Sequence, residues 1–144
     1  MPTVLHFEDD KLLQVVIADL LEDVGMTAIS GELDRRGAAR QVHNLDYDLV
    51  LTDMQMPNFD GVDVLEWVRR QRPGTPVVAL TGASPNQLMR IGCDPAQFAS
   101  FLFKPADLEV LLNVIDHLLS GGPSAGADAI PDSPRFSSGA GWRG

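Results

Sequence analysis

Cysteine, lysine and long apolar runs are scarce in this chain of 144 residues, which contains one cysteine and two lysines. A single cysteine forms no intrachain disulfide, and no apolar run approaches the roughly 20 residues of a membrane-spanning helix. Basic residues are also few, because 11 of them stand against 20 acidic residues and the net charge is -9. Such a charge repels nucleic-acid phosphates and anionic lipids. We therefore expect a cytoplasmic protein with no nucleic-acid partner and no membrane partner.

Apolar residues make up 44% of the chain and charged residues 22%, as in ordinary globular domains. Short β-branched and apolar runs predict strands over 3–7, 26–30, 48–52, 76–80 and 101–103. Helical periodicity predicts helices over 11–24, 34–44, 62–71, 85–91 and 107–119. This strict alternation is typical of the α/β class. We expect a doubly wound five-stranded parallel sheet with five helices, arranged as three α/β/α layers.

The last 25 residues differ in composition from the rest of the chain. Glycine, serine and proline account for 14 of the 25 residues from 120 to 144, and apolar residues show no periodicity there. Such a segment buries too little apolar surface to offset the entropy of ordering it. The sequence therefore predicts one folded domain over 1–120 and a disordered tail over 121–144.

Polar residues follow four of the predicted strands: Glu8, Asp9 and Asp10 after the first, Asp53 after the third, Thr81 after the fourth and Lys104 after the fifth. The carboxyl ends of parallel strands meet at one edge of a sheet, where ligands bind. Several carboxylates gathered there repel one another unless a cation intervenes, and oxygen ligands without histidine or cysteine favour Mg²⁺. We interpret Glu8, Asp9 and Asp53 as a magnesium site and Asp10 as the N-cap of the first helix.

The two residues that follow the last two strands favour phosphate chemistry at this edge. Lysine occurs only at Lys11 and Lys104, and Lys104 directly precedes Pro105 at the end of a buried strand. An ammonium group there can pair with a phosphoryl group, and the hydroxyl of Thr81 can donate to a phosphate oxygen. The arrangement suits capture of a phosphoryl group by the carboxylate of Asp53.

Four segments in this order, VLHFEDD, LVLTDMQMPNFDG, LTGAS and FLFKPAD, resemble the receiver domain of two-component response regulators. The resemblance covers residues 3 to about 120 and implies a CheY-like, flavodoxin-like fold. It implies that Asp53 accepts phosphate from a phosphohistidine. It also implies that Asp9 and Asp53 ligate Mg²⁺ together with the backbone carbonyl of Gln55, and that Glu8 acts through a bound water.

The same resemblance assigns roles to residues of the last two strands. Thr81 and Lys104 would hold the phosphate, and the Lys104–Pro105 peptide bond would be cis. As a switch, Thr81 would move toward the phosphoryl group while Phe101 turns inward. Phe101 stands where the family often has tyrosine, so we expect the side-chain rotamer of Phe101 to switch less sharply between two states. The segment 95–100 departs from the family pattern, because Pro95 interrupts the place where the fourth helix would continue and Gln97-Phe98-Ala99-Ser100 replaces the usual small residues.

The function implied by this resemblance is that of a phosphorylation-controlled binding module in a two-component system or phosphorelay. Its expected partners are a histidine kinase or histidine phosphotransfer protein and an unknown downstream protein, with the chain a monomer or a phosphorylation-dependent dimer. We expect no enzyme activity beyond self-phosphorylation from a donor and self-dephosphorylation. The alternatives are a receiver fragment of a hybrid histidine kinase and a magnesium-dependent phosphatase of the haloacid dehalogenase type. Gln55 opposes the phosphatase, because that family has an aspartate two residues after its nucleophile.

Overall fold

The computed structural model of the chain describes residues 1–121. The strands are β1 (Thr3–Phe7), β2 (Thr27–Ser30), β3 (Leu49–Thr52), β4 (Val77–Thr81) and β5 (Ser100–Phe103). The helices are α1 (Lys11–Asp23), α2 (Arg35–Asn44), α3 (Gly61–Gln71), α4 (Pro85–Arg90) and α5 (Leu108–Leu119), with a short 3-10 helix η1 (Pro95–Gln97) before β5. The predicted tail covers residues 121–144, and its residues 122–144 lie outside the described part of the chain.

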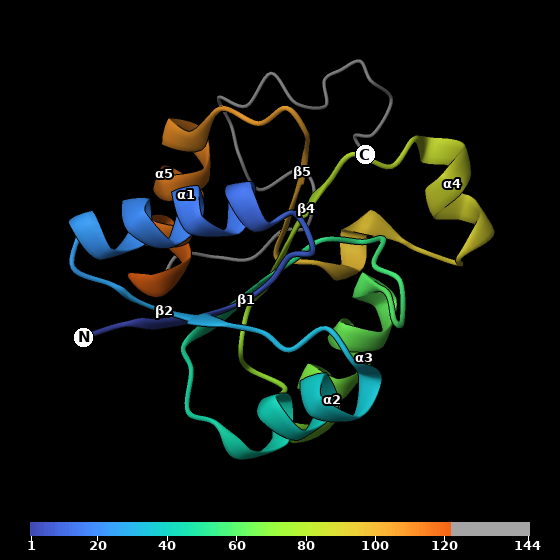
Figure 1. Cartoon of the computed structure of the whole chain (residues 1–144), viewed down its shortest axis with the longest axis horizontal. Helices are drawn as coiled ribbons and strands as arrows, with labels where there is room; N and C mark the ends of the chain where they lie inside the picture. The colour runs from blue at the N-terminus through green and yellow to red at the C-terminus, as the bar shows by residue number, and fades with distance from the viewer. Residues whose placement is uncertain (122–144) are drawn as a thin grey trace.

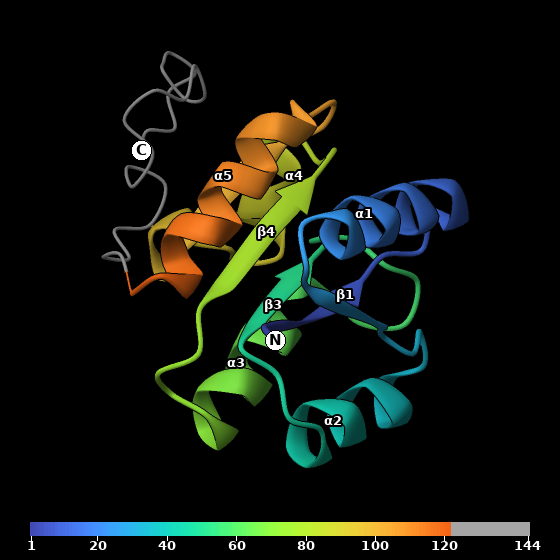
Figure 2. The same cartoon turned by 90° about the vertical axis from the view of Figure 1, so that its left-hand side faces the viewer.

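The strands form one parallel sheet in the order β2-β1-β3-β4-β5. Helices α1 and α5 cover one face of the sheet, and α2 and α3 cover the other (Figures 1 and 2). This arrangement confirms the predicted α/β fold with a doubly wound sheet. No helix within residues 1–121 combines the length and the apolar character that a membrane crossing requires.

Two apolar layers hold the helices to the sheet. Along β1, Leu5 and Phe7 pack toward α2 and α3, whereas Val4 packs toward α1 and α5. All four residues of β3 are buried, as expected for a central strand that is covered on both faces. Helices thus cover both faces of the sheet, and the polar side chains of interest lie at the carboxyl ends of its strands.

Each predicted helix and strand is present, and no end differs from its predicted position by more than one residue. The helices begin one residue after a side chain that accepts backbone N–H bonds, and these N-caps are Asp10, Asp34, Asp60, Ser84 and Asp107. We predicted helices starting at 34 and 107, but those aspartates are caps because their carboxylates satisfy the first free N–H groups. The expected role of Asp10 as a cap is confirmed. Helix η1 was not predicted.

Candidate functional site

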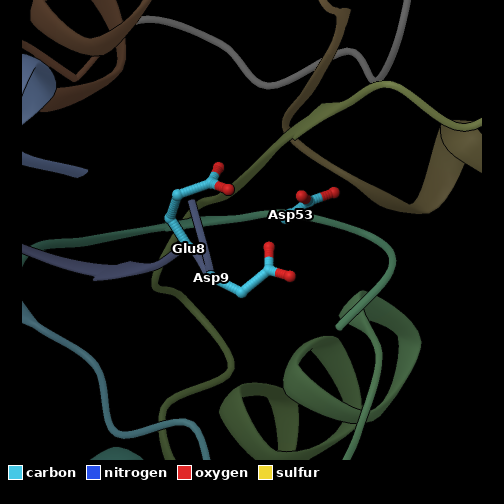
Figure 3. Close-up of side chains that lie close together, drawn as sticks. All are labelled: Glu8, Asp9 and Asp53. Carbon is cyan, nitrogen blue, oxygen red and sulfur yellow. The ribbon is translucent and has the colours of Figure 1, made fainter. Parts of the chain in front are cut away.

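The acidic cluster forms because β1 and β3 are neighbours. The Asp53 N–H donates to the Phe7 carbonyl at 3.0 Å, so the residues that follow the two strands stay side by side. Carboxylate oxygens of Glu8, Asp9 and Asp53 lie within 4.8 Å of one another. Figure 3 shows the three side chains turned toward a common space. Glu8 and Asp53 are buried and Asp9 is exposed, so the cluster opens to solvent on the side of Asp9.

A single lysine side chain joins two of these carboxylates. The Lys104 Nζ lies 3.0 Å from Asp53 Oδ2 and 3.0 Å from Glu8 Oε1. It donates hydrogen bonds to Asp53 Oδ2 and, at 3.2 Å, to Glu8 Oε2. The Lys104 N–H donates to the Thr81 carbonyl at 2.7 Å, which fixes the end of β5 against β4. The Lys104–Pro105 peptide bond is cis, as expected.

Burial sets the electrostatics of Glu8, whose side chain is only 1% exposed. Burial raises the pKa of Glu8, and the Asp10 N–H and the Lys104 ammonium offset part of that rise. Burial would by itself lower the pKa of Lys104, but its hydrogen bonds to Asp53 and Glu8 outweigh burial and raise it. The lysine therefore stays charged, and it is the cation that the carboxylates share.

The cluster fits a hydrated magnesium ion in its donor chemistry. Three carboxylates without histidine or cysteine form an oxygen-only donor set. Within the described residues, Glu8 Oε1 is buried and accepts no hydrogen bond, although Lys104 lies nearby. The Lys104 ammonium, 3.0 Å away, offsets the charge of this oxygen, and a bound water would supply the hydrogen bond that it lacks. Glu8 therefore suits the predicted contact through a metal-bound water.

The loop after β3 orients the carboxylate of Asp53. Its Oδ1 accepts the Met54 N–H at 2.6 Å and the Gln55 N–H at 3.3 Å. Gln55 pairs with Asp60 in an isolated antiparallel bridge, and Asp60 caps α3. Asp53 is thus held by backbone donors at one oxygen and by Lys104 at the other. The predicted ligation of Mg²⁺ by the Gln55 carbonyl stays a prediction.

Thr81 and Phe101 lie on the strands that adjoin this site. Thr81 is the last residue of β4, and its buried Oγ1 accepts the Ala83 N–H at 3.0 Å. Phe101 is fully buried on β5, three residues before Lys104. The predicted movement of both residues on phosphorylation stays a prediction.

Two contacts at the site did not follow from the sequence. One is the pairing of Lys104 with Glu8 as well as with Asp53. The other is the edge-on contact between Phe101 and the buried ring of Phe98. The rarity of lysine in the sequence indicated that Lys104 is functional but not that it pairs with Glu8. No sequence signal marked Phe98 as buried.

Comparison with known proteins gives one consistent result. A family model described as the response regulator receiver domain matches residues 4–116. The transcriptional regulatory protein TcrA of Mycobacterium tuberculosis is 32% identical over 140 residues, which cover 94% of this chain and 51% of that protein. The sensor kinase/phosphatase CqsS of Vibrio cholerae is 28% identical over 116 residues, which cover 78% of this chain and 16% of that protein. The chain thus spans about half or less of the length of these curated relatives.

Solved structures agree with the sequence matches. The receiver domain of the Francisella response regulator 1452 superposes with a TM-score of 0.70 and 25% identity, covering 84% of this chain and 98% of that one. The chemotaxis response regulator CheY4 of Vibrio cholerae gives a TM-score of 0.67 and 25% identity, covering 82% and 98%. Since the family match extends over most of the folded part, from β1 into α5, this chain belongs to the family of response regulator receiver domains.

Proposed function

We propose that Asp53 takes a phosphoryl group from a phosphohistidine of a histidine kinase or histidine phosphotransfer protein, and that this changes the affinity of the chain for a partner protein. The observation that carries the proposal is the set of contacts around Asp53. Its carboxylate faces Glu8 and Asp9 and is held by Lys104 and by two backbone N–H groups. A carboxylate that is fixed in this way beside a cation is equipped to act as a nucleophile toward phosphorus.

In the proposed transfer, a carboxylate oxygen of Asp53 forms a bond to phosphorus while the phosphorus–nitrogen bond of the donor breaks. The electron pair of that bond leaves with the imidazole. Lys104, which already contacts Asp53, pairs with the oxygens of the arriving phosphoryl group. The Thr81 hydroxyl accepts the Ala83 N–H, so its own proton can be donated to a phosphoryl oxygen.

Glu8, Asp9 and Asp53 are the side chains that would hold a magnesium ion. When bound, the ion neutralises the negative charge that gathers on the phosphoryl oxygens. Lys104 offsets the charge of Glu8 and Asp53 in the resting site and would pair with the phosphoryl oxygens after transfer.

Mass spectrometry of the intact protein tests the proposed function. Wild-type protein incubated with acetyl phosphate and Mg²⁺ is expected to gain about 80 Da, the mass of one phosphoryl group, and Asp53→Ala is expected to gain nothing. Asp19→Ala, which changes an exposed aspartate on α1, is the matched control and should label like wild type. An unlabelled wild type or a labelled Asp53→Ala would refute the assignment. Turnover of para-nitrophenyl phosphate beyond one equivalent would instead favour a phosphatase.

The surface beside the site favours a protein as the phosphodonor. Helix α1 begins two residues after Asp9 and exposes Leu12 (74%) and Val15 (53%), which lie about one helical turn apart. A small phosphodonor does not need exposed apolar side chains, whereas a protein surface buries them on docking.

We expect Leu12→Ala to slow phosphoryl transfer from a phosphorylated histidine phosphotransfer protein by about tenfold, because truncated anchor residues typically cost more than 1 kcal/mol. Labelling by acetyl phosphate should stay within about twofold of wild type. Val24→Ala is the matched control, since Val24 is 55% exposed at the far end of α1. Equal losses with both donors would show that the substitution damages the site itself.

A further inference from the structure

Phe101 lies in an aromatic cluster between β5 and the segment that precedes it. The ring of Phe98 meets that of Phe101 edge-on, with centroids 5.5 Å apart and planes at 83°. The ring of Phe103 lies 5.4 Å from Phe101 at 52°. Phe101 is 0% exposed and Phe98 is 2% exposed. With Asp53 paired to Lys104, the ring of Phe101 is therefore already inside the protein.

Backbone and side-chain bonds fix Phe98 from both sides. Its N–H donates to the Pro95 carbonyl at 3.1 Å, which closes the turn of η1, and the next N–H, of Ala99, donates to the Val77 carbonyl at 2.9 Å. The Arg69 guanidinium of α3 donates to the Gln97 carbonyl at 2.6 Å. Phe98 thus joins a short capped turn to the sheet, and its ring has a defined position against Phe101.

Packing opposes any outward movement of Phe101. The ring belongs to the apolar cluster that also contains Leu88 of α4 and Ala83. Turning it out would expose a fully buried phenyl group and would break its edge-on contact with Phe98. Both effects favour the buried position, independently of the state of Asp53.

We propose that Phe98 is a positioning residue that holds Phe101 in its buried position before and after phosphorylation, so that this ring does not switch, in contrast to the inward turn that the family resemblance implies. The statement about the phosphorylated chain rests on the proposed function, and the statement about the unmodified chain does not. A partner that recognises the phosphorylated chain would then detect a change other than the ring of Phe101.

Fluorine NMR of protein labelled with 4-fluorophenylalanine tests this proposal. The chain has six phenylalanines, and Phe101→Leu identifies the Phe101 signal. The change in that signal between H₂O and D₂O measures contact of the ring with solvent. Beryllofluoride with Mg²⁺ mimics the phosphoryl group, and fluoride bound at the site gives separate signals in the same spectrum. If these bound signals are missing, the proposed function fails, while spectra of the unmodified chain still test Phe98.

The wild-type Phe101 signal is expected to show no solvent isotope shift with or without beryllofluoride. In Phe98→Ala without beryllofluoride, the solvent isotope shift of the Phe101 signal should reach at least half that of free 4-fluorophenylalanine. Addition of beryllofluoride should abolish this shift. Phe59→Ala is the control for general loosening, because Phe59 is buried in the same cluster but pairs with Phe7 and Trp67. The proposal is overturned by a wild-type shift that disappears on binding, or by a Phe98→Ala ring that is shielded in both states. If Phe98→Ala does not fold, Phe98→Leu, which keeps an apolar side chain and removes the edge-on ring contact, is measured in its place.

Discussion

Replacing Lys104 with methionine is expected to slow labelling by acetyl phosphate about 100-fold and to tighten Mg²⁺ binding about tenfold. Methionine keeps an unbranched apolar stem and removes the charge. The loss of rate follows because a fixed cation at the reacting oxygens commonly contributes a factor of 10² to 10³. The gain in metal affinity follows because the ammonium lies 3.0 Å from both Asp53 and Glu8 and repels a second cation at the same carboxylates.

These opposite changes separate a loss of charge from a loss of structure. Labelling rates come from intact mass, and Mg²⁺ affinity comes from isothermal titration calorimetry on the protein without phosphodonor. Lys11→Met is the matched control, because Lys11 is the other lysine of the chain and is exposed on α1. Slow labelling together with weaker Mg²⁺ binding would mean that the site had collapsed, and it would contradict the role given to Lys104.

The sequence predicted the fold well because its signals are local and repeated. Five apolar runs and five amphipathic segments alternate strictly, and alternation alone restricts the sheet to parallel pairing. Polar residues at strand ends then come together for a topological reason, which is why Glu8, Asp9 and Asp53 were predicted as neighbours before any distance was known. The predicted starts of α2 and α5 were one residue early because of caps, where one carboxylate decides whether a residue lies inside or outside the helix.

The contacts that escaped prediction depend on the reach and packing of individual side chains. The pairing of Lys104 with two carboxylates depends on how far its long stem reaches from the end of β5 toward Asp53 and Glu8, which follow β3 and β1. Phe98 lies in a segment that begins with Asp94-Pro95, a pair typical of a loop. Its burial results from the turn of η1 and from the hydrogen bond that Arg69 donates to the Gln97 carbonyl. Periodicity carries no information about either contact, because the first joins residues far apart in the chain and the second depends on a turn and on the bond from Arg69 to the Gln97 carbonyl.

Acidification should destabilise the protein through His6, which lies in β1 and is only 2% exposed. Burial, together with the positive charge of Lys104, lowers the pKa of His6 from 6.5 to about 4. Between these values the unfolded chain binds a proton at His6 and the folded chain does not. The free energy of unfolding must therefore fall as the pH falls through this window, whereas above pH 6.5 the contribution is fully present. A shift of this size corresponds to about 3 kcal/mol at most.

Urea unfolding of wild type and His6→Leu from pH 6.5 down to about 4 measures this effect. The difference in unfolding free energy between the two proteins should change by about 3 kcal/mol across the window, with wild type losing more. The comparison removes the opposite slope from Glu8, whose raised pKa lets the folded chain take up a proton more readily. His43→Leu, at an exposed position of α2, is the control. Parallel curves for wild type and His6→Leu would show that His6 takes up its proton without cost to the fold, and that its burial does not limit stability in acid.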